Sequence, residues 1–233
     1  ADGQLKCGRT GIEGGQWFIF VREREPVIPP LDMDDFRGVL TDVPNENIND
    51  SDWCQCYAGR YAQDNISLDD LIRNCNGNKV MMGCRPAGDP NWSVLAMGET
   101  DEIFEDTGNN NNDSHRHNNV AWYHSRNQSW GFAPVGVPIR RASCDTDNTQ
   151  GARKLCWHTE NGDMAPGWRC GEERGLNGGL AWERAIWTQG GQSNCVPPAA
   201  CNGDEDCQEE GFTCQEGRCL RPPPECLVDR DCD

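Results

Sequence analysis

The sequence predicts a mainly β, disulfide-rich domain followed by small cysteine-rich repeats. Fifteen cysteines are spread along 233 residues, and short runs of aromatic and β-branched residues alternate with Gly, Asn, Asp and Pro. The hydrophobic content of 36% leaves a thin core, so covalent bridges have to supply part of the stability. We predict a β-rich α+β fold: a compact antiparallel β domain over 1–190, with one or two short helices and long loops, and a repeat or stalk segment over 191–233.

The predicted strands are short apolar runs bounded by turn residues. They are QWFIFV (16–21), KVMMG (79–83), WSVLAM (92–97), NVAWY (119–123), SWGFA (129–133), RKLCW (153–157) and LAWERAIW (180–187). One helix is predicted after Ser67, because Ser67 and Asp70 have the spacing of a capping box. Leu68, Leu71 and Ile72 then form one apolar face.

Two segments, 33–53 and 99–117, show little periodicity and are predicted to be long loops. Loops of this length inside a compact domain are uncommon, and most of them are functional or disordered. The second segment is acidic at its start and contains two closely spaced histidines at its end.

The cysteines fall into two groups that differ in spacing. Those of the globular part are widely spaced and even in number, so they can close four bridges: Cys7, Cys54, Cys56, Cys75, Cys84, Cys144, Cys156 and Cys170. Those of the tail are crowded: Cys195, Cys201, Cys207, Cys214, Cys219, Cys226 and Cys232. Because disulfides persist in oxidising compartments, this usage predicts a secreted or cell-surface protein.

The tail contains an internal repeat. CNGDEDC and CLVDRDC show the same C-x5-C frame 25 residues apart. A unit this short cannot bury enough apolar surface to fold without bridges. Four cysteines allow three pairings, of which we favour Cys201–Cys214 with Cys207–Cys219. Proline-rich VPPAA and RPPPE flank the complete unit, so we expect a stalk that continues into further units.

The net charge of the chain limits the classes of molecule that it is expected to bind. A net charge of −17 disfavours binding to phosphate backbones and to anionic lipid surfaces. No apolar run approaches the roughly 20 residues needed to span a bilayer. The polar start ADGQ is typical of a mature N-terminus after signal-peptide removal. The expected partners are copies of the chain, other cell-surface components, or glycans, with no nucleic acid and no membrane insertion.

Tryptophan is the most unusual part of the composition, with nine tryptophans against three tyrosines. Exposed indole rings can stack on the apolar faces of sugars. We therefore name Trp122, Trp130 and Trp168 as candidate glycan-binding residues. The alternative is that these rings supply buried area to a thin core beside the disulfides.

Calcium is the expected cofactor if there is one. Closely spaced Asp and Asn side chains in a loop can supply several of its six to eight oxygen ligands. The first candidates are Asp145, Asp147 and Asn148 in CDTDN; others are the acidic loop with Asp101, Glu102, Glu105 and Asp106, and Asp204, Glu205 and Asp206 in the tail. None matches an EF-hand loop, and the alternative for each cluster is a solvated turn.

Three histidines offer a second kind of metal site. His115 and His117 project to the same side of an extended chain, so with His124 they could bind a transition metal. The alternative is a solvent-exposed loop. Glu160 with Asp163, and Glu183 beside Arg184, are carboxylates considered for acid–base catalysis, although Glu183 and Arg184 fit ion pairs on a strand face better. No common catalytic motif is present, so we expect a protein that is not an enzyme.

Several motifs between residues 70 and 190 resemble a module of large secreted or surface proteins of Gram-negative bacteria. They are MMGCRP (81–86), FEDTGNNNN (104–112), AWYHS (121–125), SWGFAPVG (129–136), SCDTD (143–147), KLCWHT (154–159), GWRCG (167–171), GLN (175–177) and AWERAIW (181–187). Residues 201–232 resemble short repeats of bacterial surface proteins and lipoproteins, with the pattern C-x-x-D-x-D-C…C…G-x-C. This resemblance implies a spacer or adhesion role for the repeats and no particular activity for the module.

Three functions remain in order of preference. The first is an extracellular structural or adhesive surface protein, or a self-assembling filament subunit, with a disulfide-locked head and a stalk. The second is a calcium-assisted, lectin-like module that binds glycans. The third is a hydrolase of extracellular polysaccharides, which would need two carboxylates about 5–10 Å apart in a cleft lined by tryptophans.

Overall fold

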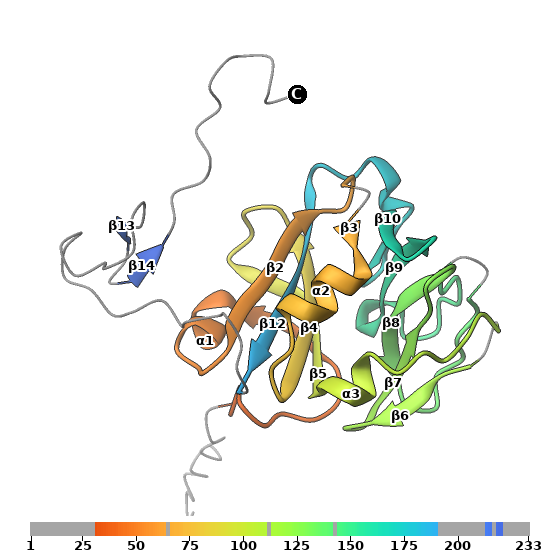
Figure 1. Cartoon of the computed structure of the whole chain (residues 1–233), viewed down its shortest axis with the longest axis horizontal. Helices are drawn as coiled ribbons and strands as arrows, with labels where there is room; N and C mark the ends of the chain where they lie inside the picture. Colours follow the sequence, from red (N-terminus) through yellow and green to blue (C-terminus); the bar gives the residue numbers. More distant parts are fainter. Residues whose placement is uncertain are drawn as a thin grey trace, which may run out of the picture. The chain divides into compact units, whose positions relative to one another are not determined.

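The computed structural model describes residues 31–63, 66–110, 113–141 and 144–190, together with the backbone of two short strands in the tail. The described chain is mainly β, with two antiparallel sheets and few short helices (Figure 1), which confirms the predicted fold class. The predicted strand QWFIFV lies outside the described residues, as do Cys7 and Cys195.

The first sheet has the strand order β1-β5-β4-β12-β2. Its strands are β1 (Leu40–Pro44), β5 (Asn91–Glu99), β4 (Lys79–Pro86), β12 (Trp182–Gln189) and β2 (Cys54–Arg60). The second sheet has the order β11-β10-β9-β8-β7-β6, and β3 pairs with β10. Its strands are β11 (Glu173–Arg174), β10 (Asp163–Cys170), β9 (Leu155–Glu160), β8 (Ser129–Pro134), β7 (Val120–His124), β6 (His115–His117) and β3 (Ile66–Ser67).

The main core lies between the two sheets. Alternate residues of each strand point inward, as the period of two along a strand requires. Val80 and Met82 of β4 share one hydrophobic cluster with Trp122 of β7, Trp130 of β8 and Trp157 of β9. The Trp130 and Trp157 rings meet edge to face, with centroids 5.4 Å apart.

Loops cover the outer face of each sheet. On the first sheet, the segment predicted as the loop 33–53 contains β1 and the helix α1 (Asn45–Asn49), and its Phe36 and Trp53 pack on Trp92 and Trp187. On the second sheet, a smaller cluster includes Tyr123 and loop residues such as Ile139. Side chains on both faces of the strands are therefore buried, which explains why several strands are continuous apolar runs in the sequence.

The predicted helix is α2 (Leu68–Asn74). Its cap is the one expected from the sequence, because the Ser67 hydroxyl accepts a hydrogen bond from the backbone N–H of Asp70 at 3.3 Å. A further helical turn, α3 (Thr100–Ile103), stands at the start of the predicted loop 99–117, and β6 stands at its end. Two 3-10 turns, η1 (Gly151–Arg153) and η2 (Leu176–Gly178), complete the described helical segments.

Every cysteine whose side chain is described is disulfide-bonded. The bridges are Cys56–Cys75, Cys84–Cys170 and Cys144–Cys156, and Cys54 is bonded as well. Cys84 lies in β4 and Cys170 in β10, so their bridge joins the two sheets. Such bridges are consistent with an extracellular protein. None of the described helices has the length and apolar character needed to cross a bilayer.

In the tail, β13 (Thr213–Gln215) and β14 (Arg218–Leu220) form an antiparallel ribbon. The pairings Cys201–Cys214 and Cys207–Cys219 each involve a residue outside the described part, as do Cys226, Cys232 and the acidic cluster of Asp204, Glu205 and Asp206. These predictions, and the stalk itself, stay predictions.

Candidate binding site

The candidate site is built around the turn between β6 and β7. His117 pairs with Val120, so Asn118 and Asn119 form a two-residue hairpin loop. Both have positive φ, 49° and 60°, which is the requirement of a type I′ turn and which asparagine tolerates better than most residues. The Asn-Asn pair was therefore a hairpin signal at the junction between the predicted loop 99–117 and the predicted strand NVAWY (119–123).

This turn is fastened to two other segments. The Asn118 side-chain amide donates to the carbonyls of Phe36 and Met97, both at 2.9 Å, and the Asn118 carbonyl accepts from the Gly38 N–H at 2.9 Å. Gly98 of β5 allows the close approach, because a Cβ there would lie 2.6 Å from the His117 ring. The segment before β1, the end of β5 and the turn are thus fixed relative to one another.

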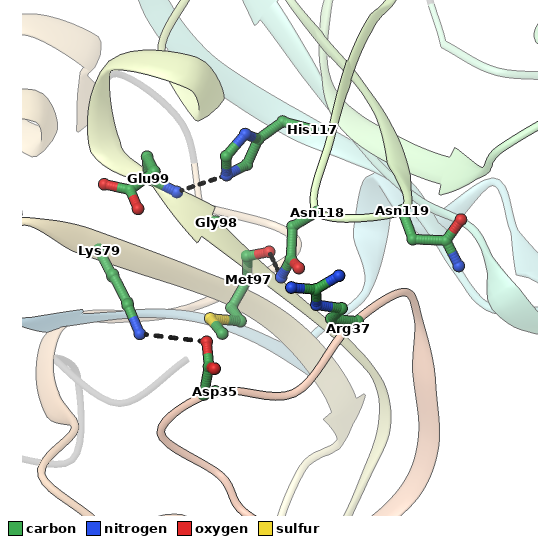
Figure 2. A pocket seen from close by; sticks show the side chains of 9 residues that line it. All are labelled: Asp35, Arg37, Lys79, Met97, Gly98, Glu99, His117, Asn118 and Asn119. Atoms are coloured by element: carbon green, nitrogen blue, oxygen red, sulfur yellow. Dashed lines mark hydrogen bonds and ion pairs between the residues drawn. The ribbon is translucent and has the colours of Figure 1, made fainter.

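A pocket of about 370 Å³ opens where these segments meet (Figure 2). Among its lining residues, all but Met97 and Gly98 have polar side chains. The full lining is Asp35, Arg37, Lys79, Met97, Gly98, Glu99, His117, Asn118 and Asn119. The sequence did not point to Asp35, Arg37 or Lys79, because they come from a loop and a strand far from the turn in the chain. A pocket of this kind offers hydrogen-bond donors and acceptors and little apolar surface.

The charges in the pocket are only partly paired. The Lys79 ammonium donates to the Asp34 carbonyl at 2.8 Å and lies 3.5 Å from the Asp35 carboxylate. Arg37 is exposed, and its guanidinium has no hydrogen bond or ion pair with any residue in the described part of the chain. Its five N–H donors are therefore available to a ligand.

The His117 ring lies between the pocket and an acidic neighbour. Its Nε2 accepts a hydrogen bond from the backbone N–H of Glu99 at 3.1 Å (Figure 2). Because a backbone N–H can only donate, the neutral ring carries its proton on Nδ1. That Nδ1 lies 4.0 Å from the Glu102 carboxylate.

Beside the pocket, Glu102, Glu105 and His115 form a carboxylate–histidine cluster. The His115 Nε2 contacts the Glu102 carboxylate, and its Nδ1 lies 3.1 Å from the Glu105 carboxylate. One candidate ligand atom from each of the three residues lies within 4.8 Å of the other two. The glutamates come from α3 and the residues just after it, and the histidine comes from β6, so packing of α3 against β6 brings the cluster together (Figure 1).

The residues predicted to bind calcium do not line the pocket. They contact lysine and arginine side chains of the protein itself. Asp145 is fully buried, and its carboxylate lies 2.9 Å from the Lys154 ammonium. Asp147 lies 3.3 Å from the same ammonium, and hydrogen bonds from Thr149, with a smaller effect of Lys154, lower the pKa of its carboxyl. The Asn148 amide oxygen accepts from Arg169 at 3.1 Å. The oxygens of these three residues are thus engaged by lysine and arginine side chains of the protein, and calcium binding there stays a prediction.

Two of the three predicted glycan-binding tryptophans are buried. Trp122 has 1% and Trp130 has 0% of its surface exposed, so neither can stack on a sugar. Both belong to the core between the sheets, which is the alternative considered from composition. Trp168 is half-buried and packs against the cluster on the outer face of the second sheet, away from the pocket lining.

His124 is not with the other two histidines of the predicted transition-metal site. It is buried between the rings of Phe104 and Trp130, and burial lowers the pKa of its imidazole to about 4. His115 and His117 do share one strand, β6, as expected.

The carboxylates considered for catalysis also have structural positions. Glu160 and Asp163 face each other across the β9–β10 turn. Glu183 pairs with Arg60 and Arg85, as expected for a strand face. Arg184 differs from the prediction: it is buried and donates to the Gln63 carbonyl at 2.8 Å instead of forming a surface ion pair.

No protein-family model, curated protein or solved structure matches the chain. The resemblance to secreted bacterial modules therefore stays a prediction.

Proposed function

We propose that this chain is an adhesive domain of an extracellular protein, and that it binds a small hydroxyl-rich ligand, such as a sugar residue of a glycan, in the polar pocket. The observation that carries this proposal is the Arg37 guanidinium, which has no partner among the described residues, in a pocket whose other lining groups are mostly polar.

The size and chemistry of the pocket fit a sugar. Its volume of about 370 Å³ lies at the small end of the roughly 300–1,000 Å³ typical of ligand sites. Each sugar hydroxyl both donates and accepts a hydrogen bond, and Arg37, Asn119 and Glu99 supply both kinds of partner. Because no Trp, Tyr or Phe of the described residues lines the pocket, we expect binding to depend mainly on hydrogen bonds and not on stacking against large rings.

The scaffold around the pocket suits a preformed site. The Asn118 side chain ties the turn to two neighbouring segments, and the Cys84–Cys170 bridge joins the sheets. Side chains held in place before binding lose less conformational entropy on binding. A rigid head of this kind is useful to a protein that must hold a ligand outside the cell.

A filament held together by apolar surfaces has less support. Among the described residues, the exposed large hydrophobic side chains are Leu31 and Leu180. A stable apolar interface between subunits needs a larger patch than two isolated leucines provide. The polysaccharide hydrolase is likewise not favoured, because no tryptophan lines the pocket.

A glycan array with the full chain tests this proposal. The test compares the unmodified protein with Arg37→Ala, and with Arg174→Ala as a matched control, because Arg174 is exposed and lies on β11 away from the pocket lining. We expect binding to a defined set of glycans that Arg37→Ala loses and Arg174→Ala keeps. Silence on the array, or equal binding by all three proteins, would contradict the proposal.

A further inference from the structure

We propose that Glu102, Glu105 and His115 form a binding site for a divalent transition-metal ion of the zinc type, at the edge where α3 meets β6. This inference does not depend on the proposed glycan binding, because none of the three residues lines the pocket.

The spacing of the ligand atoms suits a single ion. Nitrogen and carboxylate ligands lie about 2.0–2.2 Å from zinc, which places ligand atoms around a tetrahedral ion about 3.3–3.5 Å apart. The His115 Nδ1 and the Glu105 carboxylate are 3.1 Å apart, and one ligand atom from each of the three residues lies within 4.8 Å of the other two. Glu102 contacts the other ring nitrogen, Nε2, so the Glu102 side chain or the His115 ring has to turn before both carboxylates reach one ion, with water as the fourth ligand.

The ligand types favour zinc over calcium. Imidazole is a borderline ligand that suits zinc and its neighbours in the first transition series, and zinc also accepts carboxylate oxygens. Calcium takes six to eight oxygen ligands, whereas this cluster offers two carboxylates and a nitrogen. The predicted acidic loop and the predicted histidine pair each supplied part of this set, and neither prediction contained all of it.

The three residues of the cluster are accessible to solvent, and they differ in how far they are buried. The His115 side chain is 27% exposed and the Glu105 side chain is 53% exposed, so an ion can reach them from solvent. The partial burial of His115 limits the number of positions that its ring can adopt.

His117 acts as a positioning residue in this site. Its Nε2 is engaged by the Glu99 N–H, so the proton on Nδ1 faces the Glu102 carboxylate at 4.0 Å. At 4.0 Å this contact is longer than a hydrogen bond, and closing it on metal binding would give Glu102 an outer hydrogen bond of the kind whose removal typically lowers metal affinity about 10–100-fold. His117 therefore orients Glu102 and does not itself bind the ion.

Zinc titration of the full, disulfide-bonded chain tests the site. After treatment with a chelator and buffer exchange, zinc binding is measured by calorimetry and by competition with a chromogenic chelator. We expect an ion at this site whose binding is lost in His115→Gln and weakened at least about tenfold in Glu105→Gln. Glu173→Gln, which changes an exposed glutamate on β11, is the matched control and should bind zinc like the unmodified chain.

Two further variants separate the roles. His117→Gln should lower the affinity about 10–100-fold while leaving the absorption spectrum of bound cobalt unchanged in shape, because the direct ligands stay the same. Arg37→Ala should leave zinc binding unchanged. The same melting temperature for metal-free His115→Gln and the metal-free unmodified chain shows that the variant is folded.

Three outcomes would overturn the inference. They are the absence of zinc binding, zinc binding that His115→Gln leaves intact, and calcium binding at this cluster as tight as zinc binding. None of these outcomes bears on the pocket, whose test is the loss of glycan binding in Arg37→Ala.

Discussion

Burial of His124 makes the folded protein sensitive to acid. Its side chain is 4% exposed and lies against the rings of Phe104 and Trp130. Burial lowers the pKa of the imidazole to about 4, from an ordinary 6.5; Arg141 and Arg126 lower it further, and the attraction of Asp106 offsets only part of this. The neutral ring is therefore the form that the folded protein accommodates.

The direction of the pH effect follows from the difference between the pKa of His124 in the folded chain and its ordinary pKa in the unfolded chain. Between pH 6.5 and about 4 the unfolded chain holds a proton on this ring and the folded chain does not. The contribution of His124 to stability is thus complete above pH 6.5 and is lost as the pH falls towards 4. The gap between the two pKa values corresponds to about 3 kcal/mol of unfolding free energy.

His124→Phe isolates this contribution, because phenylalanine fills a similar volume and takes up no proton. Urea unfolding with the disulfides intact gives the unfolding free energy above pH 6.5 and near pH 4 for both proteins. We expect the unmodified protein to lose about 3 kcal/mol more than the variant over this range. Other titrating groups, including His158 with its lowered pKa, contribute equally to both proteins and cancel. Equal losses in the two proteins would refute the reasoning.

Three further predictions concern the interior and are checked by the same unfolding measurement. Lys154→Met leaves the buried Asp145 carboxylate without its ion-pair partner and should lower the unfolding free energy by about 3–5 kcal/mol. The added change Asp145→Asn should restore part of this loss. An unchanged stability would contradict the importance of this pair. Replacing Cys84 and Cys170 by alanine opens a loop of 86 residues and should cost about 4–5 kcal/mol, so a loss near zero would argue against the bridge. Gly131→Ala should cost about 3 kcal/mol, because its Cβ would overlap the backbone of the neighbouring strand β9; wild-type stability would show that strands β8 and β9 can move apart there.

Local signals in the sequence predicted local structure well. Ser67 and Asp70 form the cap that their spacing indicates, and most apolar runs after residue 78 became strands. These features depend on neighbours in the chain, so they can be recognised without the fold. Strands β2 and β10 were not predicted, because their two faces pack against different surroundings and their sequences therefore mix polar and apolar residues.

The sequence by itself determined that this is a disulfide-bonded β protein, because cysteine number and apolar patterning are properties of the chain alone. Only the tertiary structure decided which polar residues are free to act. Asp145 and Asp147 looked like metal ligands until packing placed Lys154 between them, whereas Glu102, Glu105 and His115 became neighbours when α3 packed against β6. The physical reason is that charge pairing and ligand geometry depend on distances of a few ångströms between residues far apart in sequence, and burial sets those distances.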